Sequence, residues 1–340
     1  MTTMNGLVLG EVRNFDSLQL KPVTLPTLEP SEVRVQIKAA ALNHRDLWIV
    51  QGLYAKIKLP VILGSDGSGV VVEVGEKVDK AWAGKSVIIN PALDWGNDPL
   101  AQQAQFRILG MPGNGTQADY VVVPATNIHI MPSHLSFEEA AALPLAGLTA
   151  YRALFTQGKL GPGEVILITG IGGGVAAMAM QLALALGNKV YVTSGDEHKI
   201  QKAKIGGAIA GVNYHDKNWA SVLGDLSNHS GFDLVVDSAG GPGFNLLLDL
   251  VKPGGKVIIF GATAGNPSDL NLRKIFWKQI RIQGTTMGTP DDFQNMLQFV
   301  KEHQIKPIIH AVYAISDYEK AYQDMMKGRQ FGKIVLKGAE

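Results

Sequence analysis

The sequence predicts an α/β protein in which a doubly wound parallel sheet is inserted into a mostly-β, barrel-like domain. Between about residues 165 and 285, short apolar runs alternate with helical patterns, which is typical of parallel strands joined by crossover helices. The preceding ~125 residues carry short alternating strands separated by Gly, Pro, Asn and Asp clusters. Short strands return after residue 304, so we expect the C-terminus to rejoin the first domain.

Each element follows from its local pattern. Apolar, β-branched runs predict five strands of the parallel sheet, with room for one helix in each crossover. They lie at 165–169, 190–194, 234–238, 256–260 and 280–284. Alternating runs predict strands of the other domain at 32–40, 69–75, 85–90, 119–124, 306–313 and 332–337, with a helix at 317–328. The expected domains are 1–127, 128–303 and the returning segment 304–340.

Composition excludes several classes of function. The 340 residues carry 31 Lys and Arg against 30 Asp and Glu, a net charge of +1, so we expect no nucleic-acid partner. The chain contains no cysteine, which excludes disulfides and thiolate metal sites, and any metal would need the 8 His and the carboxylates. The N-terminus lacks the basic and apolar regions of a signal peptide, so a cytoplasmic location is expected.

One segment is apolar enough to suggest a membrane span. Residues 165–188 carry no charge, a stretch longer than the ~20 residues that a spanning helix needs. Three consecutive glycines interrupt it, after a β-branched run and before a helical one. The pattern therefore predicts a buried strand, turn and helix, and no membrane partner.

The glycine turn GIGGGVA at 170–176 predicts a dinucleotide site. A strand-to-helix junction directs free backbone N–H groups and the positive end of a helix dipole to one place, where a pyrophosphate binds. Gly172, Gly173 and Gly174 leave the approach open, and Ala176 allows close helix packing. The fingerprint fits either Gly172, Gly174 and Ala177 or a GGVA segment at 173–176, and a purely structural turn is the other interpretation.

The second strand favours NADP over NAD. An NAD site places an acid at the end of this strand, whereas the strand here ends in Ser194. Ser194 is small and uncharged, and Lys199 follows, so a 2′-phosphate is accepted. In the alternative interpretation, Asp196 or Glu197 supplies the acid and Lys199 is a solvated helix residue.

Several ordered motifs carry a resemblance to a known family. They are NHRDLWIVQGLY at 43–54, LPVILGSDGSGVVVEVGEKV at 59–78, GTQADYVVVP at 115–124, LPLAGLTAYRAL at 143–154, the glycine turn and GKIVLK near the end. The chain resembles the medium-chain dehydrogenase/reductase superfamily, and within it the zinc-free quinone-oxidoreductase-like group. The resemblance implies a GroES-like domain with an inserted Rossmann domain, and a nicotinamide bound between them.

The resemblance also implies a cofactor and its contacts. Zinc-dependent relatives hold the metal with Cys, His and Cys, and the matching positions here are Asn43, Ser65 and Leu145, so no zinc or other metal is expected. NADP(H) is the implied cofactor. By resemblance, its pyrophosphate lies at Gly173, Gly174 and Val175, its 2′-phosphate at Ser194, Lys199 and Tyr214, and its nicotinamide ribose at Phe260, Gly261 and Thr263.

Without a Lewis acid, ordinary alcohol oxidation is disfavoured, whereas a quinone or an α,β-unsaturated carbonyl needs only positioning and hydrogen-bond donors. The candidate catalytic donors are Asn43, Tyr54 and Thr149, with Trp48 as an apolar wall. Each also has a structural interpretation: Asn43 as a turn cap, Tyr54 at a domain edge and Trp48 in the core. Asp46 is expected to cap a helix or pair with an arginine.

Two alternatives remain from the sequence. One is an enoyl-thioester reductase, for which Lys56 and Lys58 would meet the acyl carrier. The other is a non-enzymatic NADPH-binding protein, crystallin-like, redox-sensing or RNA-binding, although the near-neutral charge argues against RNA. By analogy with the family, a homodimer formed through the edge strands of the cofactor domain is expected.

Overall fold

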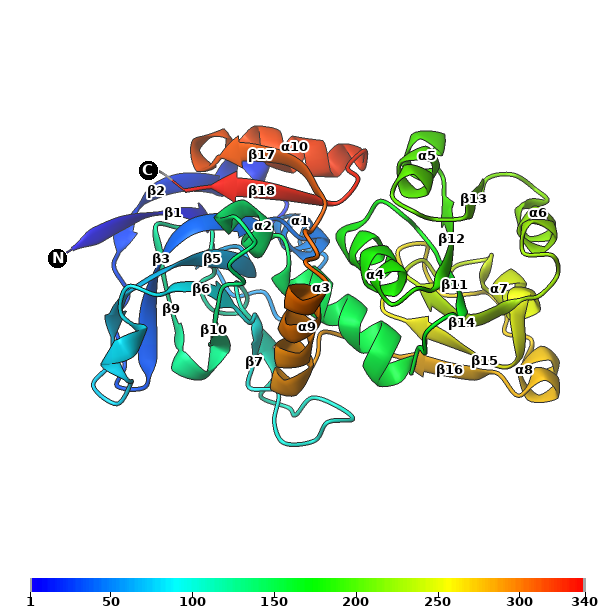
Figure 1. The fold of residues 1–340 in the computed structure, drawn as a ribbon. Helices are drawn as coiled ribbons and strands as arrows, with labels where there is room; N and C mark the ends of the chain where they lie inside the picture. The colour runs from blue at the N-terminus through cyan, green and yellow to red at the C-terminus, as the bar shows by residue number, and fades with distance from the viewer. Residues whose placement is uncertain (1, 339–340) are drawn as a thin grey trace. The chain divides into compact units, whose positions relative to one another are not determined.

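The computed structural model describes residues 2–338, which form two compact units (Figure 1). Unit 1 consists of Met1–Leu145 and Gly288–Glu340, and unit 2 of Ala146–Met287. Unit 2 is thus a single chain segment inserted between the two segments of unit 1. Helix α3 (Pro144–Tyr151) carries the chain from unit 1 into unit 2.

The units divide at 145/146 and 287/288, whereas the sequence places the boundaries at 127/128 and 303/304. Helix α2 (Phe137–Ala141) packs with the alanines at the end of β3 (Glu32–Ala41), which ties the segment after 128 to unit 1. Helix α9 (Pro290–Glu302) is tied to the same unit, since the rings of His129 and Phe293 lie 4.9 Å apart.

Unit 1 is built on a seven-stranded sheet of order β10-β6-β5-β3-β18-β17, with β9 also paired to β3. All its pairs are antiparallel except β17 with β18. The strands besides β3 are β5 (Asp66–Val74), β6 (Ser86–Ile89), β9 (Tyr120–Pro124), β10 (Ile128–Ile130), β17 (Ile309–Ala314) and β18 (Lys333–Lys337). Strand β3 alternates buried and partly buried residues, as a sheet with one covered face requires.

The remaining elements of unit 1 surround this sheet. Strands β1 (Thr3–Leu9), β2 (Leu18–Thr24) and β4 (Val61–Ile62) form a three-stranded sheet, and β7 (Ala92–Leu93) pairs with β8 (Arg107–Ile108). The helices are α1 (His44–Val50), α2, α9 and α10 (Tyr318–Lys327), with short turns η1 (Phe15–Ser17), η2 (Lys80–Trp82), η3 (Ala125–Asn127) and η5 (Ile315–Asp317).

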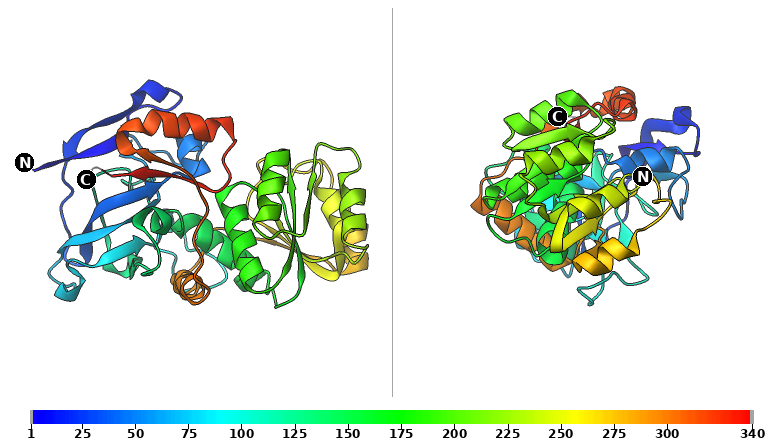
Figure 2. Two further views of the ribbon diagram at one scale, coloured as in Figure 1. Left: turned by 45° about the horizontal axis from the view of Figure 1, so that its top comes forward. Right: turned by 90° about the vertical axis from the view of Figure 1, so that its right-hand side faces the viewer.

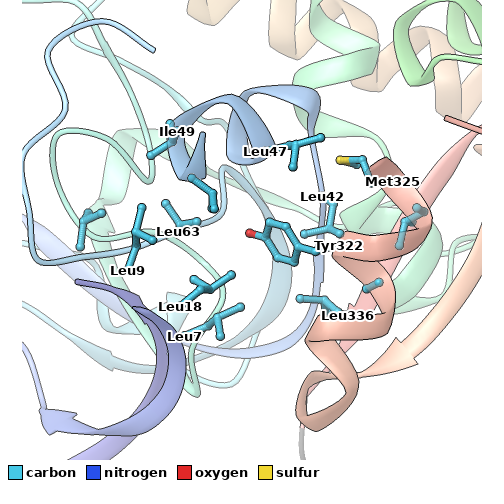
Figure 3. Packing of buried hydrophobic residues seen from close by; sticks show 14 of the residues in the cluster. Leu7, Leu9, Leu18, Leu42, Leu47, Ile49, Leu63, Tyr322, Met325 and Leu336 are labelled. Atoms are coloured by element: carbon cyan, nitrogen blue, oxygen red, sulfur yellow. The ribbon is translucent and has the colours of Figure 1, made fainter. Parts of the chain in front are cut away.

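The C-terminal strand β18 completes the centre of unit 1. It pairs antiparallel with the end of β3, with Val335 opposite Ala41. Helix α10 packs Tyr322 into a cluster of leucines from β1, α1 and β18 (Figure 3). The Tyr322 hydroxyl donates to Gln117 Oε1 at 2.9 Å, and complete burial raises the pKa of this phenol well above its ordinary value. The C-terminal segment of unit 1 is therefore part of the same core as the N-terminal strand β1.

Unit 2 contains a six-stranded parallel sheet of order β13-β12-β11-β14-β15-β16. In chain order this is 3-2-1-4-5-6, the doubly wound arrangement whose switch point lies between β11 and β14. Helices cover both faces, with α4 and α5 on one and α7 and α8 on the other (Figures 1 and 2). The carboxyl ends of the strands share one edge, where ligands bind in such sheets.

The elements of unit 2 lie close to their predicted positions. Its strands are β11 (Val165–Ile168), β12 (Lys189–Ser194), β13 (Ala210–Asn213), β14 (Phe232–Asp237), β15 (Val251–Ile259) and β16 (Arg281–Gly284). Its helical segments are the π-helical η4 (Arg152–Gln157), α4 (Gly174–Ala185), α5 (Glu197–Ile205), α6 (Trp219–Leu226), α7 (Phe244–Leu250) and α8 (Leu272–Lys278). Strand β13 has no counterpart among the five predicted strands.

The uncharged segment 165–188 forms β11, the glycine turn and α4, as predicted. Within residues 2–338, no helix combines the length and the apolar character that crossing a membrane would require.

Candidate functional site

The glycine turn of unit 2 joins β11 to α4. Gly173 is the N-cap residue and α4 begins at Gly174, which places the first helical N–H groups at 174–176. Gly172 has a φ of 116°, in a region that a side chain would strain. The Ile171 N–H donates to Thr193 O at 2.8 Å, which holds the turn against β12. The structure thus presents the dipole end of a twelve-residue helix, and Gly173 at its start is exposed, with only Gly170 O within 4 Å of where a Cβ atom would lie.

A buried carboxylate organises the neighbouring strand ends. Asp237, at the end of β14, accepts the Thr169 hydroxyl at 2.6 Å and the Gly240 N–H at 2.8 Å. Burial raises the pKa of Asp237, and these hydrogen bonds oppose the shift. Asp237 therefore ties the loop after β14 to the residue that opens the glycine turn. The sequence analysis did not identify this residue.

The loop after β15 is tied to the loop after β14. Thr263 N donates to Ser238 O at 3.2 Å, and Phe260 N donates to Asp237 O at 3.0 Å. A Cβ atom at Gly261 would lie 2.9 Å from Ser238 O, so glycine permits this close approach. Phe260, Gly261 and Thr263 therefore lie on the same edge of the sheet as the glycine turn, on the far side of β14.

Ser194 and Tyr214 meet at the ends of β12 and β13. Ser194 is opposite Asn213 in the strand register, and its carbonyl accepts the Tyr214 N–H at 3.1 Å. A Cβ atom at Gly195 would lie 2.7 Å from both the Tyr214 hydroxyl and the His215 Nε2. Strand β13, which the sequence analysis missed, is thus the element that brings Tyr214 beside Ser194.

Lys199 lies on the first turn of α5, whose N-cap is Asp196. Partial burial lowers the pKa of Lys199, and the neighbouring Asp196 carboxylate opposes this shift. Asp196 uses its side chain to cap the helix, since Oδ1 accepts the His198 N–H at 2.8 Å. This capping role is a structural use for the acid that the alternative NAD interpretation would place on the ribose.

In unit 1, three buried polar residues meet where β3 ends, β5 begins and β18 begins. Ala41 at the end of β3 is opposite Asp66 of β5 and Val335 of β18, so Asn43, Asp66 and Lys333 converge. Lys333 Nζ donates to Asn43 Oδ1 at 2.6 Å and to Asp66 Oδ2 at 2.9 Å. The side chains of Lys333 and Asp66 are 4% and 0% exposed, which makes this a buried ion pair.

These contacts fix the orientation of the Asn43 amide. Lysine can only donate hydrogen bonds, so the amide oxygen must face Lys333. The amide nitrogen then faces Asp66 Oδ2, to which it donates at 2.9 Å. Leu145 N binds the other carboxylate oxygen at 2.8 Å. One Nδ2 hydrogen is thereby committed to Asp66.

A second buried network lies beside the first. The Arg45 guanidinium donates to Ser65 Oγ, to Leu109 O at 2.8 Å and, through Nε, to the Tyr54 hydroxyl at 3.3 Å. The guanidinium carbon lies 4.9 Å from the centre of the Tyr54 ring. Tyr54 is partly buried, and its side chain also packs against the hydrophobic core cluster around Tyr322.

Asp46 has the capping role expected for it. Its Oδ2 accepts the Asn43 N–H at 2.8 Å at the start of α1, and burial raises the pKa of the carboxyl. Trp48 is partly exposed on α1, with its ring 5.6 Å from that of His44. Thr149, on the part of α3 in unit 2, is buried at 5% exposure.

The residues at the positions of a zinc site do not fit zinc. The Asn43 oxygen accepts a lysine ammonium, the Ser65 hydroxyl is bound to Arg45 and to Leu109 O, and Leu145 has an aliphatic side chain. The Lys333 ammonium at 2.6 Å from Asn43 Oδ1 would also repel a cation at that oxygen. Among residues 2–338, no group of three or more His, Asp or Glu side chains is placed to hold a metal ion.

Known protein families share this architecture. The family model described as alcohol dehydrogenase GroES-like domain matches residues 29–133, and that described as zinc-binding dehydrogenase matches residues 174–302. The chain is 36% identical to a zinc-type alcohol dehydrogenase-like protein of Leptosphaeria maculans, covering 94% of each. It is 30% identical to an acryloyl-coenzyme A reductase of Sulfurisphaera tokodaii, covering 94% of this chain and 96% of that one.

A solved structure called NAD-dependent alcohol dehydrogenase superposes with a TM-score of 0.92 at 36% identity, covering 98% of this chain and 99% of the other. The parallel sheet, its glycine turn and these relatives define an oxidoreductase fold with a GroES-like and a Rossmann domain. The chain belongs to the medium-chain dehydrogenase/reductase superfamily.

Proposed function

We propose that this protein is a zinc-independent, NADPH-dependent oxidoreductase that transfers hydride to a quinone or an α,β-unsaturated carbonyl. The observation that carries the proposal is the Asn43, Asp66 and Lys333 cluster, because it puts a fixed amide donor at a position where zinc-dependent relatives hold the metal. An amide donor suits an acceptor whose conjugation already delocalises the incoming charge. The two domains, 1–127 with 304–340 and 128–303, are also part of this proposal, and the compact units of the structure divide at 145/146 and 287/288.

NADP(H), when bound, supplies the hydride. The residues that would hold it are the glycine turn at Gly172–Val175, the Ser194, Lys199 and Tyr214 group, and the loop from Phe260 through Gly261 to Thr263. The turn offers backbone N–H groups to a pyrophosphate. Ser194 adds no negative charge, and Lys199 is a cation on the first turn of the helix that follows.

The chain's own residues have three roles in the proposed reaction. Asn43 donates its second Nδ2 hydrogen to the carbonyl oxygen of the acceptor, where negative charge develops. Thr149 contributes a second contact to the acceptor, through its hydroxyl. Tyr54 donates the proton that completes reduction of an unsaturated carbonyl, and its oxygen is reprotonated from water.

An enoyl-thioester reductase is the second candidate, and the similarity to a protein named acryloyl-coenzyme A reductase favours it. This activity uses the same hydride transfer to the β-carbon and the same proton transfer to the α-carbon, with a thioester as the conjugated carbonyl. The basic residues that we suggested for the acyl carrier, Lys56 and Lys58, are both exposed.

The testing experiment measures oxidation of NADPH and of NADH by the purified, chelator-treated protein with quinones, enones and enoyl thioesters. We expect turnover with NADPH on at least one of these acceptor classes and no stoichiometric zinc by elemental analysis. NADH is the competing cofactor, because one related structure is called NAD-dependent. NADPH binding without turnover would favour the non-enzymatic alternative, and one zinc per chain would refute the zinc-free assignment.

Replacing Ser194 with Asp tests the cofactor assignment. The added carboxylate would repel a 2′-phosphate, so we expect KM for NADPH to rise by roughly tenfold or more, the equivalent of about 1.4 kcal/mol, with little change for NADH. The new carboxylate can accept the Asp196 N–H that Ser194 Oγ accepts at 3.2 Å. Ser194→Ala is the control, because it removes the hydroxyl without adding charge. Equal effects of the two substitutions would place the 2′-phosphate elsewhere.

The homodimer is also part of this proposal. Strand β16 is at the end of the sheet order, and Phe276 and Trp277 on the adjacent α8 are 67% and 82% exposed. An edge strand and exposed aromatic side chains are features that a second copy covers. We expect light scattering to give twice the chain mass of 36.4 kDa, and Trp277→Glu to shift the protein toward the monomer. A monomeric wild-type protein would refute this expectation.

A further inference from the structure

Arg45, which is buried in unit 1, makes hydrogen bonds to which the proposed reaction assigns no role. Arg45 is 6% exposed and binds three oxygens, Ser65 Oγ, Leu109 O and Tyr54 Oη, none of which is a carboxylate. The buried Asp46 carboxylate attracts this charge without a hydrogen bond to it, so the guanidinium keeps part of its desolvation cost. If Arg45 served only the fold, an apolar side chain of similar volume would give equal or greater stability.

The anchoring of Arg45 makes its position rigid. Nη1 is held by Ser65 at the start of β5 and by the Leu109 carbonyl, and Ser65 Oγ also lies 2.9 Å from that carbonyl. Two fixed contacts on one side of a planar guanidinium determine where its Nε hydrogen points. That hydrogen points to the Tyr54 hydroxyl at 3.3 Å.

The direction of this hydrogen bond determines what Tyr54 can do. Arginine only donates, so the Tyr54 oxygen is the acceptor and its own hydrogen is directed away from Arg45. The same phenol would otherwise rotate freely between donating and accepting. We propose that Arg45 is the positioning residue for proton donation by Tyr54, fixing the phenol as a donor toward an unsaturated carbonyl acceptor. This inference rests on the proposed function and narrows it to acceptors that are protonated on carbon.

The proton step balances without another reactant. After hydride reaches the β-carbon, the carbon–carbon π electrons move to the carbonyl oxygen as an enolate. The Tyr54 O–H bond breaks, a C–H bond forms at the α-carbon, and water returns a proton to the Tyr54 oxygen. A quinone differs, because its reduced product is protonated on oxygen, which water does quickly without a positioned donor.

Enone and quinone reduction differ in this proton step, so a comparison of the two activities tests the proposal. We expect Tyr54→Phe to lower kcat for an enone by roughly a hundredfold, the lower end of what a general acid contributes. Arg45→Met should lower it by about tenfold, because the phenol remains but is no longer oriented. Arg45→Met should lower quinone reduction no more than a few-fold, whereas a purely structural role of Arg45 would reduce both activities together.

A double-mutant cycle tests whether Arg45 acts through Tyr54. Arg45→Met in the Tyr54→Phe background should cost little further enone activity. If Arg45→Met fails to fold, Ser65→Ala serves the same purpose, because it removes only one anchor of the guanidinium. Full additivity of either substitution with Tyr54→Phe would overturn the proposal, as would equal losses of enone and quinone reduction.

A readout independent of turnover separates this inference from the proposed function. In protein labelled with tyrosine ζ-¹³C, the Tyr54 signal, assigned with Tyr54→Phe, should shift on Arg45→Met. An unchanged signal would overturn the contact and with it the proposal. A protein that reduces quinones but no enone retains the proposed function and overturns the role of Arg45. A protein that reduces no acceptor overturns both.

Discussion

Replacing Asn43 with Ala is expected to abolish most acceptor reduction while leaving NADPH binding intact. Removal of one positioned donor at a developing oxyanion typically lowers kcat by about a hundredfold to a thousandfold. The amide is held by Lys333 on one side and Asp66 on the other, so the donor costs no reorganisation when the charge develops. Steady-state kinetics with a quinone and an enone, beside NADPH titration by fluorescence, measures both parts of the prediction.

A matched control separates catalysis from packing. Asn127 is also a buried asparagine of unit 1, and its amide nitrogen donates to Asn90 O at 3.1 Å and Ala92 O at 3.0 Å. Asn127→Ala should therefore lower thermal stability about as much as Asn43→Ala without the selective loss of turnover. If Asn43→Ala keeps wild-type kcat, or if Asn127→Ala loses as much, the donor role of Asn43 is refuted.

The parts of the fold that could be predicted are those with local signals. The β-branched runs and the three glycines after VILIT predict β11, the turn and α4 because each signal lies within a few residues of the chain. Strand β13 was missed because its sequence, AGVN, is short and contains small and polar residues. Its pairing with β12 overrides a weak local propensity, as tertiary contacts often do in strands.

The candidate site also contains residues that the sequence predicts and residues that it does not. Asn43, Ser65 and Leu145 could be assigned by resemblance, but their partners could not. Lys333 lies 267 residues from Asp66, in a short strand where a lysine normally reaches solvent. Only the register that sets β18 and β5 on either side of the end of β3 brings the two together. Arg45 gave no signal either, because its role depends on the Leu109 carbonyl and on Tyr54 beyond the end of α1.

The limits of the compact units differ from those of the predicted domains for a related reason. The segment after 128 and helix α9 carry sequence patterns that suit either domain, and only their packing decides. His134 Nε2 lies 3.0 Å from Ile305 O, which joins the residues before α2 to those after α9 across 171 positions of the chain. No pattern within a window of ordinary length reports such a contact.

Replacing Lys333 with Met is expected to lower the free energy of unfolding by about 3–5 kcal/mol, the usual cost of removing one partner from a buried ion pair. Asp66 would keep its hydrogen bonds from Asn43 Nδ2 and Leu145 N but would lose the only cation bound to it among the described residues. Urea denaturation followed by far-ultraviolet circular dichroism measures the loss.

Two comparisons make this prediction specific to the buried charge. Lys320→Met removes the partner of Asp317 from an exposed pair, whose side chains are 70% and 44% exposed, and should leave the free energy of unfolding almost unchanged. Adding Asp66→Asn to Lys333→Met removes the uncompensated charge, so the double variant should be more stable than Lys333→Met alone. A Lys333→Met protein as stable as Lys320→Met would show that Asp66 does not need this cation. The orientation of the Asn43 amide would not change in that case, because Asp66 Oδ2 can only accept a hydrogen bond and so faces the Nδ2 end of the amide.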